Sequence, residues 1–106
     1  MALDTNTKSF NSFKDFYPFY LAEHSNSISR RLHFVGTSLV ILISCYIFMT
    51  EFWKLIYLLP IAGYGFAWIG HFVFEKNKPA TFKHPFYSLI GDFVMFGQIL
   101  AGKIKF

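Results

Sequence analysis

Two long stretches without a charged residue constrain this chain more than any other feature. Phe34–Met49 runs for 16 residues and Leu55–Phe74 for 20 residues without Asp, Glu, Lys or Arg. An α-helix rises ~1.5 Å per residue, so about 20 apolar residues cross the ~30 Å hydrocarbon layer of a membrane. The second stretch has this length, and the first reaches it when Leu32 and His33 are added. We therefore expect two membrane-spanning helices.

A third apolar stretch, Pro85–Gly102, is shorter and contains Asp92. It is compatible with a third span, with a helix tilted at the interface, or with packing inside the bundle. The composition fits a lipid-embedded chain, because 54% of the residues are hydrophobic and only 15% are charged. It excludes intrinsic disorder, and the single Cys45 excludes a disulfide scaffold. A soluble bundle of three buried helices is the alternative, but such helices usually keep a polar face toward water.

The segment before the first span has its own pattern. We expect residues 1–8 to form a loose tail and residues 9–106 to form one helical membrane domain. From Ser9 to Glu23, aromatic residues recur at helical spacing, which predicts an amphipathic helix lying in the membrane interface. Ser29 is the predicted cap of the next helix. The predicted fold is thus all-α: a small helical membrane protein with an N-terminal interfacial helix and two to three transmembrane helices.

The basic residues predict the orientation of the chain. Seven of the ten precede the first predicted span or follow the second: Lys8, Lys14, Arg30, Arg31, Lys76, Lys78 and Lys83. The positive-inside rule makes that side cytoplasmic, together with the N-terminus. The net charge of +4 is then explained by topology and contact with anionic lipid. We expect no nucleic-acid partner, since no basic and aromatic pattern for binding bases is present.

Four histidines lie near the same predicted ends of the spans. His24 and His33 come at the start of the first span, whereas His71 and His84 come at the end of the second and just beyond it. An antiparallel hairpin would bring these positions together on the cytoplasmic side. Imidazole suits iron, zinc, copper or nickel, so the sequence predicts a metal site. Taken singly, each histidine is equally compatible with an interfacial residue bonded to backbone or lipid.

Two acidic residues are further candidates for the site. Glu75 lies one helical turn after His71, so it is expected either to bind the same ion or to orient a histidine; a solvated helix end is the alternative. Asp92 is an ionisable residue within an apolar segment, which usually indicates function or pairing. It is expected to orient a metal-bound histidine, to pair with Arg30 or Arg31, or to be a ligand itself.

Small residues predict how the two spans pack. Gly36 lies in the first span, and Gly63, Ala67 and Gly70 share one face of the second. Small residues at this spacing usually mark close contact between helices in a membrane. His33 is then expected to face the interior of the bundle.

Three motifs resemble the 2-hydroxy fatty acid dioxygenase family, whose fungal member acts in alpha-oxidation during phytosphingosine breakdown. They read YLAEHSN at Tyr20–Asn26, RLHFVGT at Arg31–Thr37 and WIGHFVFEKNKPA at Trp68–Ala80, and Gly91–Phe96 is similar to the short members. The resemblance implies an integral membrane, Fe(II)-dependent dioxygenase. Such an enzyme converts a 2-hydroxy fatty acid and O2 to CO2 and a fatty acid one carbon shorter.

The resemblance also implies roles for particular residues. His24, His33 and His71 lie within the matching motifs and would hold the iron, whereas His84, a further candidate ligand, lies outside them. The candidate catalytic residues are His24, His33, His71, Glu75 and Asp92. The candidate contacts of the lipid substrate are Arg30, Arg31, Asn26 and Lys76.

Two other functions remain open at this point. The chain is also compatible with a non-enzymatic membrane protein that binds haem or a metal through its histidines. A small oligomeric transporter subunit with Asp92 as its intramembrane charge is the third possibility. Oligomeric state, number of metal ions and substrate chain length are left open by the sequence.

Overall fold

The computed structural model describes residues 10–106, so the predicted tail of residues 1–8 lies outside the described part. The elements are α1 (Phe13–Ala22), α2 (Ser27–Thr50), η2 (Trp53–Tyr57), α3 (Leu58–Ile69), η3 (Gly70–Glu75), η4 (Ala80–Phe82) and α4 (Pro85–Leu100). No strand occurs among the described residues, and the predicted all-α fold is confirmed.

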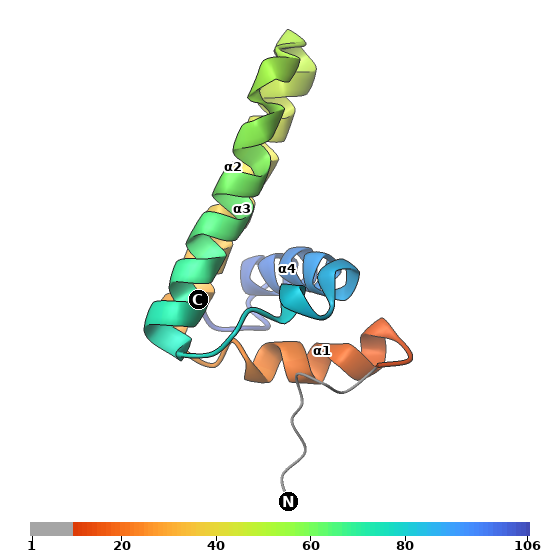
Figure 1. The fold of residues 1–106 in the computed structure, drawn as a ribbon, viewed down its shortest axis with the longest axis vertical. Coiled ribbons are helices and arrows are strands. Elements are labelled where there is room, and N and C mark those ends of the chain that lie inside the picture. Colours follow the sequence, from red (N-terminus) through yellow and green to blue (C-terminus); the bar gives the residue numbers. More distant parts are fainter. Residues whose placement is uncertain (1–9) are drawn as a thin grey trace, which may run out of the picture.

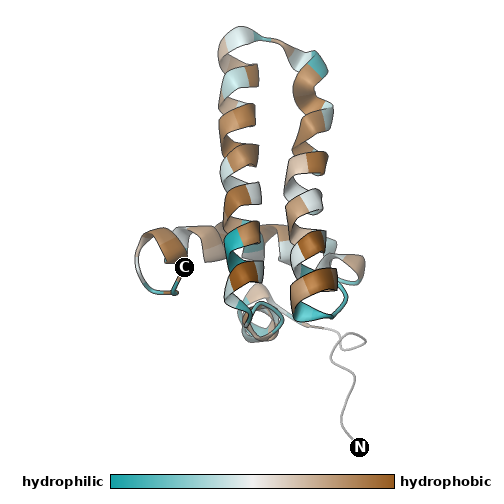
Figure 2. Ribbon diagram, turned by 90° about the vertical axis from the view of Figure 1, so that its left-hand side faces the viewer, coloured by the Kyte–Doolittle hydropathy of each residue, from teal (hydrophilic) through white to brown (hydrophobic). Residues whose placement is uncertain are grey.

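A long antiparallel hairpin dominates the molecule (Figures 1 and 2). One arm is α2, with 24 residues, and the other is the continuous run Trp53–Glu75, with 23 residues. The chain reverses after α2 through Glu51, which adopts the left-handed conformation with φ of 58°. Both arms are long and apolar enough to cross a membrane, as the uncharged stretches predict.

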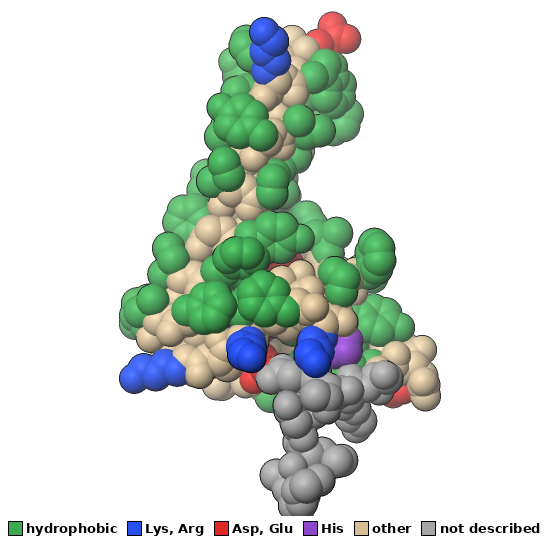
Figure 3. Space-filling view, viewed as in Figure 1, with side chains coloured by type: hydrophobic (Ala, Val, Ile, Leu, Met, Phe, Trp, Pro, Cys, Tyr) green, Lys and Arg blue, Asp and Glu red, His purple; other side chains and the backbone are tan. Residues whose placement is uncertain are grey.

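The sides of this hairpin are covered by exposed apolar residues. Figure 3 shows apolar side chains along its length, with charged side chains at its base and at its tip. Leu42, Phe48 and Met49 are examples of large side chains that no other part of the described chain covers. Three buried helices of a soluble bundle would not leave such a surface, so that alternative does not describe this fold.

The third apolar stretch does not extend the hairpin. It forms α4, whose 16 residues lie across the base of the two arms, and α1 lies beyond α4 (Figure 1). Phe16 and Tyr20 of α1 are fully buried in one cluster with Met95 and Ile99 of α4. The apolar face of α1, predicted from its spacing, is therefore used for packing against α4. The described chain has two helices of spanning length rather than three.

Two glycines allow the hairpin arms to approach closely near its base. A Cβ atom on Gly36 would lie 3.0 Å from the carbonyl oxygen of Ala62, and one on Gly70 would lie 2.8 Å from Ser29 Oγ. Both distances are shorter than ordinary carbon contacts, so a larger residue at either position would force its neighbour to shift. The predicted small-residue packing is confirmed at these two points, which lie on either side of His33 along α2.

The start of α2 differs from the sequence-based expectation. Asn26, not Ser29, is the cap: its Oδ1 accepts hydrogen bonds from the backbone N–H of Ile28 at 2.9 Å and of Ser29 at 3.2 Å. The expectation for Ser29 is wrong because the helix begins at Ser27, which places Ser29 inside its first turn. The side chain of Ser29 is buried against Gly70 instead.

Candidate metal centre

Three of the four histidines meet at the base of the hairpin. His24 follows α1, His33 lies in the second turn of α2, and His71 lies in η3. Their exposed fractions are 1%, 5% and 2%, and one ring nitrogen from each lies within 4.8 Å of the others. We call these three residues the histidine centre. The predicted convergence is thus confirmed for them, although they are up to 47 residues apart in sequence.

Backbone carbonyl groups fix the rings of two of these histidines. Nδ1 of His24 lies 2.6 Å from the carbonyl oxygen of Tyr20, and Nδ1 of His33 lies 3.1 Å from that of Ser29. A carbonyl oxygen only accepts hydrogen bonds, so each Nδ1 must be the protonated nitrogen. The Nε2 atom of each neutral ring then carries a free lone pair.

Asn77 fixes the third ring in the same way. Its side-chain nitrogen donates to the carbonyl oxygen of Glu23 at 3.3 Å and to Glu23 Oε2 at 3.1 Å. The amide oxygen must therefore face His71, whose Nδ1 donates to it at 2.7 Å. All three histidines thus keep Nε2 available as a metal ligand. Histidines that bind metals usually donate their other N–H group to an oxygen in this manner.

The sequence does not show that Asn77 and Glu23 together hold the ring of His71. Asn77 follows the second span in a polar turn, where an asparagine is ordinarily explained as a helix break. It reaches back because its backbone N–H donates to the carbonyl oxygen of His71 at 3.0 Å. The wide π-helical turn of η3 precedes it, and such turns are frequent at functional sites. The sequence signal that could have identified Asn77 is its position six residues after His71, a candidate ligand.

The two Nε2 atoms of His24 and His33 lie only 3.0 Å apart. Both protons are on Nδ1, so neither Nε2 has a proton to donate and two lone pairs face each other. Burial, with the nearby His33 and His71 adding to it, lowers the pKa of His24 well below its ordinary value. The two rings therefore do not readily take up a further proton between their Nε2 atoms. A metal cation bound there would relieve the repulsion between the two lone pairs.

The space and the donor set fit a single metal ion. A cavity of about 20 Å³ is lined by all three histidines, which is enough for one ion or one water molecule. Two nitrogens bound to one ion at about 2.1 Å lie about 3 Å apart when the bonds are at right angles. Three neutral imidazoles suit iron, zinc, copper or nickel. The histidine centre could hold any of these metals.

Asp92 lies beside the histidine centre and reaches it through an aromatic ring. It accepts a hydrogen bond from the hydroxyl of Tyr20, whose ring stacks on His24 with centroids 4.0 Å apart. Asp92 lines the cavity of the centre as well. Tyr20 thus connects Asp92 to His24, and sequence reasoning missed this partner of Asp92 because 72 residues separate the two.

The predicted pairing of Asp92 with an arginine is not what the structure contains. Arg30 donates instead to the carbonyl oxygens of His24 at 3.1 Å, Ser25 at 2.7 Å and Lys105 at 3.1 Å. Arg31 donates to the carbonyl oxygen of Phe106 at 3.4 Å. These two guanidinium groups hold backbone segments together at the base of the hairpin.

Glu75 also holds the base together. Its carboxylate accepts from the backbone N–H of Asn26 at 2.5 Å and from Ser25 Oγ at 3.4 Å. Neither contact involves a histidine, and Glu75 does not line the cavity of the histidine centre. It fastens the end of η3 to the segment between α1 and α2. Asn26, one of the predicted substrate contacts, thus caps α2 with its side chain and donates its backbone N–H to Glu75.

His84 and Lys76 lie outside the centre. The ring of His84 is packed among aromatic rings, with centroids 5.1 Å from Phe10 and 5.4 Å from Phe16. Among the residues described, it is not part of the group close enough to share an ion. Lys76 ends η3 in the left-handed conformation and has an exposed side chain.

A pH-dependent stability follows from the position of Asp92. Burial raises the pKa of Asp92 from 3.8 to about 7, although its hydrogen bond with Tyr20 acts in the opposite direction. Between these two values the folded chain holds one more proton than the unfolded chain. Its free energy of unfolding therefore falls as the pH rises through this range and levels off above it.

We accordingly expect Asp92→Asn to raise the melting temperature relative to the parent protein more at about pH 8 than at about pH 5. Asparagine cannot ionise but can still accept the hydrogen bond from Tyr20. Thermal unfolding of the two metal-free proteins in detergent measures the difference, and contributions from groups common to both proteins cancel. An equal gain at both pH values would show that Asp92 does not titrate in this way.

Comparison with models of known protein families identifies one matching family. The model described as "2-hydroxy-palmitic acid dioxygenase Mpo1-like" matches residues 10–104, which is nearly the whole chain. No curated protein and no solved structure matches the sequence or the fold closely enough to add a relative. The matched range includes the histidine centre, Asn77 and Asp92.

Proposed function

Since the chain belongs to the 2-hydroxy-palmitic acid dioxygenase Mpo1-like family, we propose that it is a membrane-embedded, Fe(II)-dependent dioxygenase of 2-hydroxy fatty acids. The observation that carries the proposal is the convergence of three histidines whose Nε2 atoms are all free to bind one ion. A family name alone would not identify the residues that hold the metal.

The proposed reaction breaks the bond between C1 and C2 of the substrate. C1 leaves as CO2, C2 becomes the carboxyl carbon of the shortened acid, and the four electrons released reduce O2, with water as the other product. Bound Fe(II) would supply open coordination positions and the redox chemistry that O2 requires. His24, His33 and His71 would hold it.

The protein's own groups would prepare this site in three ways. The Tyr20 and Ser29 carbonyls and the Asn77 amide keep the protons of the three rings on Nδ1. Burial keeps the rings neutral and excludes bulk water. Asp92, through Tyr20, holds the ring of His24 in place, so we propose it as a positioning residue.

The proposed location follows from the hairpin. We propose that α2 and the arm Trp53–Glu75 cross the membrane, with the base and the N-terminus on the cytoplasmic side. The cationic residues at the base support this orientation, and charged side chains gather there in Figure 3. Arg30, Arg31, Asn26 and Lys76 remain proposed contacts for the head group of the substrate, and of these Arg31 and Lys76 are exposed.

Purification in detergent followed by an oxygen-consumption assay tests the proposal. We expect about one iron per chain and an Fe(II)-dependent loss of 2-hydroxypalmitate that yields CO2 and the acid one carbon shorter. A strong Soret band would instead indicate haem held by two histidines. Iron without turnover on 2-hydroxy acids of several chain lengths would favour the non-enzymatic alternative.

A further inference from the structure

A second and larger cavity adjoins the histidine centre. It has a volume of about 250 Å³ and lies between α2, α3 and α4. Its lining is mostly apolar: Val40, Leu89 and Phe93 are among the apolar residues, and His33, Tyr64 and Asp92 are among the polar ones. An apolar cavity with a few polar groups at one end is the usual form of a site for a small amphipathic molecule.

The two cavities meet at shared residues. His33, Tyr64 and Asp92 line both the large cavity and the small one of the histidine centre. The polar end of the large cavity is therefore next to the proposed metal ligands. From His33 the lining continues along α2 to Val40, seven residues or about 10 Å away. The cavity thus leads from the centre toward the tip of the hairpin.

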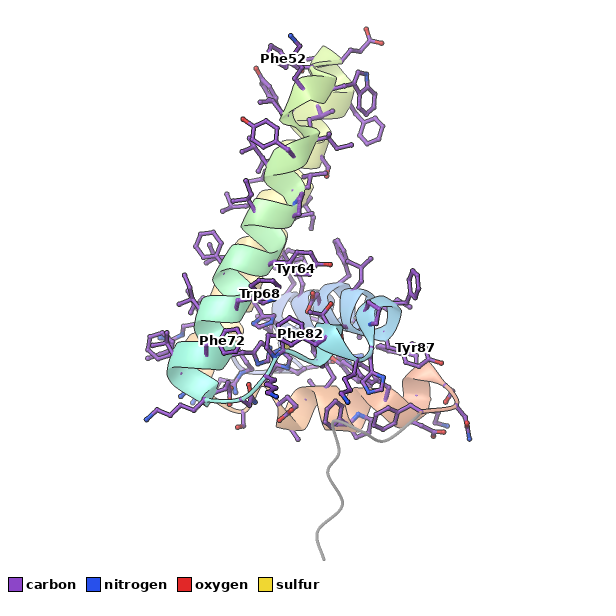
Figure 4. The ribbon with its side chains drawn as sticks, in the orientation of Figure 1. Phe52, Tyr64, Trp68, Phe72, Phe82 and Tyr87 are labelled. Carbon is purple, nitrogen blue, oxygen red and sulfur yellow. The ribbon has the colours of Figure 1, made fainter. Side chains whose placement is uncertain are left out.

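The exposure of the lining residues locates the mouth of the cavity. Tyr64 of α3 and Leu89 and Phe93 of α4 are exposed, whereas Thr37 of α2 is buried. Figure 4 shows Tyr64 beside α4, above Trp68. The cavity therefore opens sideways, between α3 and α4, where the hairpin has its apolar surface. With the hairpin in a membrane, this mouth would face the lipid chains and not the aqueous phase.

We propose that this cavity binds the acyl chain of the substrate, which enters from the bilayer between α3 and α4 with its carboxyl end toward His33. The inference rests on the proposed function and adds to it an acyl-chain site and a route. Val40, at the inner wall two turns from His33, would limit how a long chain fits. A long acid would extend beyond the cavity through the mouth into the lipid, whereas a short acid would use only its polar end.

Val40→Phe tests this assignment, with Val35→Phe as the matched control. Val35 lies on the same helix and is 40% exposed, and it lines none of the cavities described here. We expect Val40→Phe to lower the ratio of kcat/KM for 2-hydroxypalmitate to that for 2-hydroxyhexanoate about tenfold, because the added ring fills space the long chain needs. Val35→Phe should leave the ratio unchanged. An unchanged ratio in an active, iron-loaded Val40→Phe protein would overturn the inference.

A second pair of variants protects the test against misfolding of Val40→Phe. Leu89 lines the cavity from α4, and its neighbour Ile90 is exposed without lining it. Leu89→Trp is therefore expected to reduce the ratio, and Ile90→Trp is not. Both positions are at the surface of α4, so neither change disturbs buried packing.

A binding measurement separates failure of this inference from failure of the proposed function. A fatty acid with a diazirine on the part of the chain next to its carboxyl end should crosslink to lining residues in the parent protein, and less in Val40→Phe than in Val35→Phe. Crosslinking in this pattern without any turnover would leave the acyl-chain site standing and remove the dioxygenase proposal. Crosslinking that is equal in all three proteins, or confined to the outer surface of the hairpin, would remove the acyl-chain site.

Discussion

Replacement of His71 by alanine is expected to lower the iron content of the purified protein at least about tenfold and to abolish turnover of 2-hydroxypalmitate. The change removes one of three nitrogens that face a cavity of about 20 Å³ and leaves Asn77 without the ring it orients. Two histidines alone bind a divalent ion far more weakly. Metal analysis and the oxygen-dependent assay measure the two effects separately.

His84→Ala is the control for that experiment. His84 is also a histidine near the base of the hairpin, but it lies among the rings of Phe10, Phe16 and Phe19 and away from the centre. We expect this variant to keep its iron, with at most a loss of packing. Full iron content in His71→Ala, or an equal loss in both variants, would mean that the ligands are assigned wrongly. Size-exclusion chromatography in detergent establishes that each variant is folded.

Gly70→Ala is expected to have the second large effect, although no polar group is lost. The new Cβ atom would lie 2.8 Å from Ser29 Oγ and 3.3 Å from Ser29 Cα. The hydroxyl can turn away, but the backbone of α2 cannot, so α2 and η3 must separate. Overpacking of this kind costs about 1–3 kcal/mol. His33 is one turn beyond Ser29 and His71 is next to Gly70, so the same displacement moves the ligands apart.

We therefore expect Gly70→Ala to bind iron weakly and to melt at a lower temperature. Gly65→Ala is the matched control, because Gly65 lies in the same arm and a Cβ atom there meets nothing within 4 Å. If the Gly70 and Gly65 variants bind iron equally well, the close approach of the arms is not what holds the ligands together.

The hairpin and most of the centre could be predicted because they depend on local patterns. Uncharged stretches of spanning length predicted both arms. The positions of His24, His33 and His71 at the ends of those arms then followed from antiparallel geometry. Sequence position does not say how deeply a side chain is buried or which way it points. For that reason the predicted metal site also included His84.

The remaining features depend on contacts between distant segments. The helix Pro85–Leu100 packs at the base of the hairpin because it contacts α1, whose Phe16 and Tyr20 are buried against it. The bond between Tyr20 and Asp92 joins residues 72 positions apart. The role of Asn77 depends on the π-helical turn before it, for which the sequence has no clear marker. Periodicity and spacing do not contain these pairings.

The origin of the three histidines has a consequence for how the chain assembles. They come from the segment after α1, from α2 and from η3, so one bound ion would act as a crosslink across 47 residues. A ligand present at 100 times its dissociation constant stabilises the folded state by about 2.7 kcal/mol, provided that the unfolded chain does not bind it. The supply of iron would then affect the amount of the protein as well as its activity. The iron-free chain would unfold at its base more often and would be degraded by proteases more readily.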